Sequence, residues 1–292
     1  MDLSLRIAAI LFPMFGLTGL GYWYGRRHAP DMLAANRLNM DIFVPALIFS
    51  GLSGRSYDLA SYGTLALAMV LLILGTGAVA WLLARTTGQQ PLTLALPLMF
   101  NNSVNLGVPL AVLAFGPDIL PYTIVLFVVS TGLHFSLGIW LLDHKTKLSN
   151  VWRIPAVLAA IAGFALAELG LPLWPPLMVA IKMLGDISIP LALFALGVRM
   201  TEAGLSHWRD GLLGAVARPV AGMLIAWALA RLLGLQGRQA DLLLVYGALP
   251  PAVINYVFAE RYRQEPDKMA AIVLVGNLAS IITLPLVLAI VL

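Results

Sequence analysis

The amino-acid sequence predicts an all-α membrane protein with ten transmembrane helices, built as two inverted five-helix repeats with broken crossing helices 4 and 9. Three observations predict this fold: the composition, an internal repeat at half the chain length, and proline-interrupted apolar segments at matched positions. The residues are 60% hydrophobic and 11% charged, with a mean hydropathy of +0.91. Because a soluble domain carries about 25% charged residues, this composition indicates a bilayer environment.

Ten apolar stretches are candidates for membrane spans, since about 20 helical residues cross a hydrocarbon core of about 30 Å. They lie at residues 5–24, 38–53, 61–84, 91–115, 119–142, 154–171, 176–200, 211–235, 240–258 and 269–292. The first stretch lacks a small-residue cleavage site and nine more follow it, so it is interpreted as a helix and not as a signal peptide.

The two halves of the chain repeat each other. Residues 37–49 correspond to residues 182–194, and residues 81–88 correspond to residues 227–234, at an offset of about 145 residues. A repeat at half the chain length bounds the architecture, so we place one repeat at 1–145 and the second at 146–292. Five spans per repeat is an odd number, so the second repeat crosses the membrane in the opposite direction.

Basic residues predict the orientation. The loops after predicted spans 1, 3, 5, 7 and 9 hold twelve: Arg26, Arg27, Arg37, Arg85, Lys145, Lys147, Arg153, Arg199, Arg209, Arg261, Arg263 and Lys268. The other face holds five: Arg6, Arg55, Lys182, Arg231 and Arg238. The positive-inside bias therefore places both termini on the extracytoplasmic side of a cell (inner) membrane. The net charge of +4 comes from these loops and does not indicate a nucleic-acid partner.

The fourth and ninth predicted spans are equivalent in the repeat, and both carry helix-breaking residues near their middle. The fourth contains Asn101, Asn102, Ser103, Asn105, Gly107 and Pro109, and the ninth contains Pro250, Pro251 and Asn255. Proline lacks a backbone donor and clashes with the preceding turn, so we expect both helices to break here. We also expect each second half-helix to begin at a proline. The alternative is a pair of packed kinks, but broken helices at matched positions of inverted repeats are typical of a transport site.

The joint order of these motifs resembles the auxin efflux carrier family. The resemblance rests on Asn105-Leu106-Gly107-Val108-Pro109, on Leu249-Pro250-Pro251-Ala252 with Tyr256, on the segment Asp186 to Gly197 and on Thr283-Leu284-Pro285. It implies a fold similar to sodium/proton antiporters and bile-acid symporters, with spans 1, 2, 6 and 7 as a scaffold. Spans 3–5 and 8–10 would form a moving domain. It also implies organic-anion substrates, and the short central loop favours a bacterial-type member over the plant carriers.

Asparagine side chains can donate hydrogen bonds to a carboxylate where the half-helices meet. We therefore expect substrate contacts from Asn101, Asn102, Ser103, Asn105, Pro109, Pro250, Pro251, Asn255 and Arg218. Arg218 has no basic counterpart in the first repeat, where Leu72 is equivalent. A charge inside the membrane indicates function by default, but Arg218 could also snorkel to the headgroups.

The candidates for ion coupling are His134, Asp186 and Lys182. His134 could relay protons, or it could be a buried hydrogen-bonded side chain. Lys182 and Asp186 have the i,i+4 spacing that pairs charges on one helix face, and Arg37 and Asp41 repeat it. That repetition favours a structural role, while proton exchange by Asp186 stays open. We expect no cofactor beyond a coupling proton or sodium ion.

The sequence bears on three classes of function. An intramembrane enzyme is disfavoured because the chain has no cysteine, no His-Glu-x-x-His motif and no Gly-x-Gly-Asp motif. The favoured function is a secondary transporter, a permease or exporter, that moves a small organic anion, in particular a carboxylate, by elevator-like alternating access. The alternatives are a passive anion channel and a cation-coupled symporter of a bile-acid-like substrate. Membrane lipid surrounds the protein, and we expect a homodimer through the scaffold spans.

The orientation can be tested by cysteine labelling, because the chain has no natural cysteine. A cysteine at Lys145, in the central loop, should react only with reagents that reach the cytoplasm. Labelling of this cysteine from outside intact cells would contradict the inverted-repeat assignment.

Overall fold

The computed structural model describes residues 2–53, 59–145, 152–201 and 206–292, without the side chains of residues 59–61. Arg55, Lys147 and the predicted boundary at residue 146 lie outside these residues. The described chain is helical and contains no β-strand. Within these described ranges, six helical segments are long and apolar enough to cross a membrane by length and composition: Leu3–His28, Tyr62–Thr87, Pro117–Leu142, Pro175–Arg199, Trp208–Leu232 and Pro266–Val291.

The helices follow one another as α1 (Leu3–His28), α2 (Leu33–Leu38), η1 (Asn39–Phe43), α3 (Val44–Leu52), α4 (Leu59–Thr87), α5 (Pro91–Met99), η2 (Ser103–Gly107), α6 (Val108–Phe115), η3 (Pro117–Ile119), α7 (Leu120–Leu133), η4 (His134–Gly138), α8 (Ile139–Leu142), α9 (Pro155–Glu168), α10 (Pro175–Arg199), α11 (Trp208–Leu232), α12 (Arg238–Ala248), α13 (Ile254–Tyr262) and α14 (Pro266–Val291). The segments η1, η2 and η4 are π-helical turns. Each of the ten predicted stretches contains helix. The number of times the chain crosses the membrane, and the inverted orientation of the second repeat, stay predictions.

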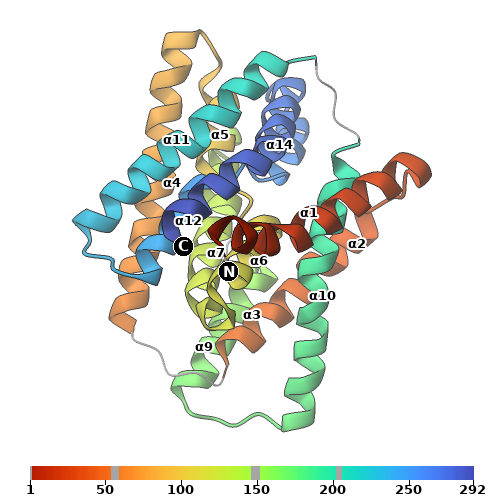
Figure 1. Cartoon of the computed structure of the whole chain (residues 1–292), viewed down its shortest axis with the longest axis vertical. Coiled ribbons are helices and arrows are strands. Elements are labelled where there is room, and N and C mark those ends of the chain that lie inside the picture. The colour runs from red at the N-terminus through yellow and green to blue at the C-terminus, as the bar shows by residue number, and fades with distance from the viewer. Residues whose placement is uncertain (1, 54–58, 146–151, 202–205) are drawn as a thin grey trace.

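The helices pack in two groups (Figure 1). In one group α10 packs against α1 and α3, and α3 packs against α9. In the other, α11 packs against α4, α12 and α14, and α4 packs against α5 and α7. Helices α1 and α10 approach each other so closely that there is no room for a side chain between them. A Cβ atom added to Gly197 would lie 1.9 Å from the carbonyl oxygen of Thr18. One added to Gly21 would lie 2.1 Å from that of Phe194.

The equivalent helices α4 and α11 run antiparallel, since Gln89, just after α4, hydrogen-bonds Asp210 in the first turn of α11. Both carry the same local contact. The guanidinium of Arg85 lies 3.5 Å from the ring centroid of Trp81, and that of Arg231 lies 5.8 Å from the ring centroid of Trp227. The sequence repeat at residues 81–88 and 227–234 therefore appears as a repeated cation–π pair.

Polar contacts join the start of α5 to the start of α14 on the same face. The Thr93 hydroxyl donates to Glu265 Oε2 at 2.6 Å, and Gln264 Nε2 donates to Thr93 Oγ1 at 3.1 Å. Partial burial raises the pKa of Glu265, but hydrogen bonds from Lys268 and Thr93 outweigh it, so the pKa lies below its ordinary value. The segments that follow α4 and α13 and the segments that precede α11 and α14 therefore lie together at one face of the molecule.

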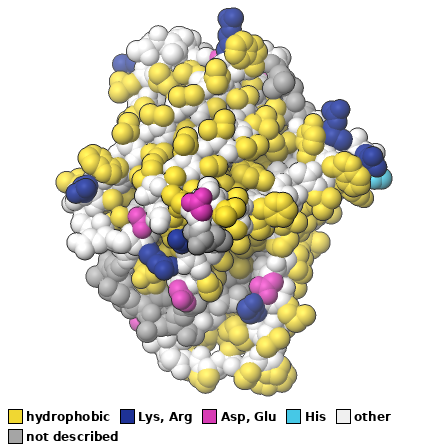
Figure 2. Space-filling model, in the orientation of Figure 1, with side chains coloured by type: hydrophobic (Ala, Val, Ile, Leu, Met, Phe, Trp, Pro, Cys, Tyr) yellow, Lys and Arg dark blue, Asp and Glu magenta, His cyan; other side chains and the backbone are white. Residues whose placement is uncertain are grey.

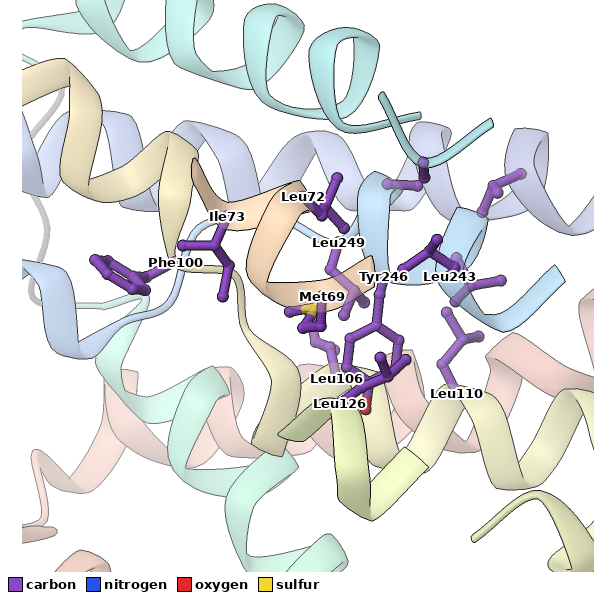
Figure 3. Close-up of a cluster of buried hydrophobic side chains, with 14 of the residues drawn as sticks. Met69, Leu72, Ile73, Phe100, Leu106, Leu110, Leu126, Leu243, Tyr246 and Leu249 are labelled. Carbon is purple, nitrogen blue, oxygen red and sulfur yellow. The ribbon is translucent and has the colours of Figure 1, made fainter. Parts of the chain in front are cut away.

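Buried apolar side chains surround the two breaks in the helices (Figure 3). Met69 and Leu72 of α4 and Tyr246 of α12 pack with Phe100 and Leu249, and each is at most 1% exposed. The outer surface is also apolar: Figure 2 shows hydrophobic side chains over most of one face, with few charges among them. The irregular backbone is therefore covered by protein, as a membrane requires.

The expectation that each second half-helix begins at a proline is wrong for the ninth predicted span and holds in part for the fourth, where Pro109 lies at the N-terminal end of α6. The first resumes at Ser103 through the π-helical turn η2, and Pro109 lies in the first turn of α6. The second resumes at Ile254, three residues after Pro251. Pro250 and Pro251 instead occupy the extended segment between the half-helices, where a residue without an N–H donor leaves no donor unpaired.

The proposed repetition of the charged i,i+4 pair is also wrong. Lys182 Nζ lies 2.9 Å from Asp186 Oδ2, whereas Arg37 and Asp41 form no ion pair within the described part of the chain. Asp41 lies in the π-helical turn η1, whereas Arg37 lies in the preceding helix α2.

Replacing Gly21 with Ala should force α1 away from α10 and lower the free energy of unfolding by about 1–3 kcal/mol. Gly19→Ala, on the same helix, is the matched control, because a Cβ there meets no atom within 4 Å. Thermal unfolding of the purified protein measures both. Equal stabilities of the two variants would contradict the close contact of α1 and α10.

Candidate functional site

The two breaks cross each other in extended conformation. Asn101 and Pro251 form an antiparallel bridge. The backbone N–H of Asn102 donates to the carbonyl of Pro250 at 2.8 Å, and that of Ala252 donates to the carbonyl of Phe100 at 2.9 Å. Each break therefore satisfies backbone groups that the other break leaves open.

Side-chain amides complete the crossing. Asn101 Nδ2 donates to the carbonyl of Tyr246 at 2.8 Å, and Asn102 Nδ2 donates to Asn277 Oδ1 at 3.1 Å. Asn277, in the middle of α14, donates to the carbonyl of Pro251 at 3.0 Å. Asn277 is not among the residues predicted from the sequence, although a lone amide within an apolar span is a signal that could have identified it.

Asn255 is fully buried and also makes structural contacts. Its Nδ2 donates to the carbonyl of Phe100 at 3.1 Å, and its Oδ1 lies 2.8 Å from Nε2 of His134. The His134 ring stacks on Phe100 with centroids 4.1 Å apart and planes 7° from parallel. Asn255 is thus less available to a ligand than we expected, and His134 is held rigidly beside the crossing.

A cavity of about 90 Å³ lies at the crossing, large enough for a few waters or a ligand of a few heavy atoms. Its lining comes from both breaks, from three π-helical turns and from the end of α7: Met40, Asn101, Asn102, Ser103, Val104, Asn105, Ser130, Thr131, His134, Phe135, Ala252, Val253 and Ile254. Because π-helical turns are rare and occur often at functional sites, their convergence here marks the cavity as the candidate site. Among the described residues, no charged side chain lines it.

Three polar side chains in this lining are open to a ligand. The half-buried amide of Asn105 and the hydroxyls of Ser130 and Thr131 have no hydrogen-bond partner among the residues the structure describes. Two helices, Ser103–Phe115 and α13, also begin here, and their N-terminal ends favour negative charge. Since buried polar groups are normally paired, this arrangement fits a small polar ligand with negative charge.

Arg218 does not snorkel to the surface, because it is only 1% exposed. Its NH1 donates to the carbonyl of Gly247 at 2.8 Å and its NH2 lies 3.3 Å from that of Tyr246. These carbonyls belong to the C-terminal end of α12, whose dipole compensates a positive charge. Arg218 therefore lies outside the cavity lining and stabilises the end of the helix that leads into the break.

Several other predicted residues lie outside the cavity lining. Pro109, Pro250 and Pro251 shape the backbone but do not line it. Lys182 and Asp186 form their ion pair on α10 with side chains 68% and 60% exposed, and neither lines the cavity. Of the three coupling candidates, the structure brings only His134 to the crossing.

A second, larger cavity of about 400 Å³ separates α10 from α13 and α14. Apolar side chains line much of it, together with Arg199, Glu260 and Asp267. Asn277 also lines it, and Val253 lines both cavities. It therefore lies directly beside the crossing, at the boundary between the two groups of helices.

Comparison with known proteins places these features in a family. The sequence profile of the family described as Membrane transport protein matches residues 139–288. A 108-residue region is 28% identical to "Auxin efflux carrier component 6" of Arabidopsis thaliana and covers 35% of this chain but 18% of the plant protein.

Two further relatives match nearly end to end. An uncharacterized transporter of Methanocaldococcus jannaschii is 22% identical over 273 residues, covering 86% of this chain and 87% of that protein. A Rhizobium meliloti protein named "Putative malonate transporter" is 25% identical over an alignment of 307 residues, covering 95% of this chain and 93% of that protein.

Asn255 and Asn105, which come from the two different breaks, should differ in their effect on stability. Asn255→Ala removes two buried hydrogen bonds and should lower the free energy of unfolding by about 1–3 kcal/mol. Asn105→Ala removes no side-chain hydrogen bond to the residues the structure describes and should change it by less than about 0.5 kcal/mol. Thermal unfolding without ligand tests this difference, and similar losses in both variants would contradict it.

Proposed function

Because the chain belongs to the membrane transport protein family, which includes the auxin efflux carriers, we propose that it is a secondary transporter of a small organic anion. The family and the apolar helices make it a multi-pass membrane transporter. The proposed substrate class, a small organic anion, goes beyond the family assignment. It rests mainly on the cavity at the crossing, where open hydrogen-bonding groups meet the N-terminal ends of two helices.

A single carboxylate suits this cavity. Asn105 and the hydroxyls of Ser130 and Thr131 can donate hydrogen bonds to it, and the helix ends supply partial positive charge. A free anion in a low-dielectric site needs such groups to replace its hydration. The Rhizobium relative named for malonate supports a small carboxylic acid as the ligand.

The mechanism we propose is elevator-like alternating access. The crossing belongs to the group formed by α4–α7 and α11–α14, which would carry the ligand. The group formed by α1, α3, α9 and α10 would act as the scaffold, and Met40 of η1 is its contribution to the cavity lining. Movement of the first group past the second would remove Met40 from the ligand and open the site to the other side.

An inverted five-plus-five repeat would support this movement. The antiparallel pairing of α4 and α11 and their repeated cation–π contact are in keeping with such a repeat. With both termini outside the cell, the larger cavity beside the crossing would adjoin the cytoplasmic loops through Arg199, Glu260 and Asp267. It would then serve as the path between the cytoplasm and the site.

Two alternatives predict different behaviour. A passive anion channel would conduct without saturation and would not accumulate its substrate. A cation-coupled symporter of bile-acid-like molecules would need the larger cavity, since such a ligand does not fit in 90 Å³. The relatives named as transporters support neither an enzyme nor a particular coupling ion.

Uptake of labelled malonate into proteoliposomes should be saturable and should respond to an imposed gradient. Asn105→Ala should weaken the apparent affinity by about fivefold to more than a hundredfold, because one or more hydrogen bonds to a charged group are lost. Asn36→Ala, a partly buried asparagine on α2 outside the cavity, is the control. Uptake by the Asn105 variant equal to that of the control would contradict this site.

A further inference from the structure

The hydrogen bonds around His134 determine which ring nitrogen carries hydrogen. The carbonyl oxygen of Phe100 can only accept, so Asn255 must direct its Nδ2 toward it. Asn255 then directs its Oδ1, also an acceptor, toward His134 Nε2 at 2.8 Å. Nε2 must therefore be the donor in this contact, and the neutral ring has its lone pair on Nδ1.

The Nδ1 atom has no hydrogen-bond partner within the described residues, and His134 lines the cavity. The groups packed around the ring are uncharged: Phe100 stacks on it, and Phe135 and Phe258 contact it edge-on. Asn255 holds the opposite edge. The cavity thus contains donors that suit a carboxylate and, on His134, an acceptor that suits a different group.

We propose that Nδ1 of His134 accepts a hydrogen bond from the transported molecule, so that the site selects acids with one carboxylate and one hydrogen-bond donor. This inference rests on the proposed function and specifies its substrate class. A dicarboxylic acid would bind with one carboxyl group ionised and the other protonated.

The absence of cationic side chains from the described lining supports this selection. A second carboxylate would be desolvated without a positive partner and would face the lone pair of Nδ1, which is unfavourable. A protonated carboxyl, a hydroxyl or an amide N–H would instead donate to Nδ1. A role of His134 limited to holding Asn255 would use Nε2 alone and would give the ligand no reason to carry a donor.

Two ligands of equal charge separate these roles. Malonamate has one carboxylate and an amide that donates, whereas monomethyl malonate has one carboxylate and an ester that does not. Isothermal titration calorimetry with the purified wild-type protein should show about 3- to 10-fold tighter binding of malonamate, the contribution of one neutral hydrogen bond. Because neither second group titrates, the comparison does not depend on pH.

Two variants then locate the acceptor. In His134→Gln the amide can reach the position of Nε2 and keep the contact with Asn255, but no acceptor stands at Nδ1, so the preference should fall to about one. In His134→Asn the amide lies near the position of Nδ1, so the preference should be largely kept. Thermal unfolding of each variant shows whether it is folded.

The binding measurements can contradict the inference in three ways. A preference for malonamate that persists unchanged in folded His134→Gln would overturn the inference and leave the proposed function intact. So would equal binding of the two ligands by the wild type, which requires no variant. If the wild type binds neither ligand nor malonate, both the inference and the small-carboxylate function are overturned.

Discussion

Every backbone polar group inside a bilayer needs a partner in the protein, and this requirement governs the centre of the structure. Two helices are interrupted within the apolar region, and each interruption leaves several N–H and C=O groups without an intrahelical partner. The crossing resolves this by pairing the two extended segments through Asn102 with Pro250 and Ala252 with Phe100. Neither break could exist in lipid without the other.

The same requirement accounts for most of the polar side chains near the crossing. Asn101, Asn102 and Asn277 bond to the backbone or to each other, and Asn255 bonds to Phe100 and His134. A cluster that reads as a binding site in the sequence is therefore largely a structural network. The groups left open, Asn105 among them, are few, and that small number makes the cavity selective in what it can bind.

Close packing of small residues places these helices. Gly222 and Gly247 bring α11 against α12, since a Cβ atom on Gly222 would lie 2.0 Å from the carbonyl oxygen of Gly247. Arg218, one turn earlier on α11, can then reach the end of α12 with its guanidinium. The charge is stabilised by the helix end, and the candidate cavity has no charged side chain in the lining that the structure describes. In membranes such small-residue contacts are a main source of helix association, because lipid offers no hydrophobic driving force between helices.

The sequence by itself determined the membrane class, the internal repeat, the helical segments and the places where two of them break. Hydropathy, periodicity and proline act over one or two helical turns, so these features can be read locally. Only the tertiary structure decided which polar groups stay open. The partners of Asn101 and Asn102 lie 145 and 175 residues away, at Tyr246 and Asn277. No local pattern could show that Asn255 is hydrogen-bonded while Asn105 has no hydrogen-bond partner among the described residues, because the difference depends on what each side chain meets across the crossing.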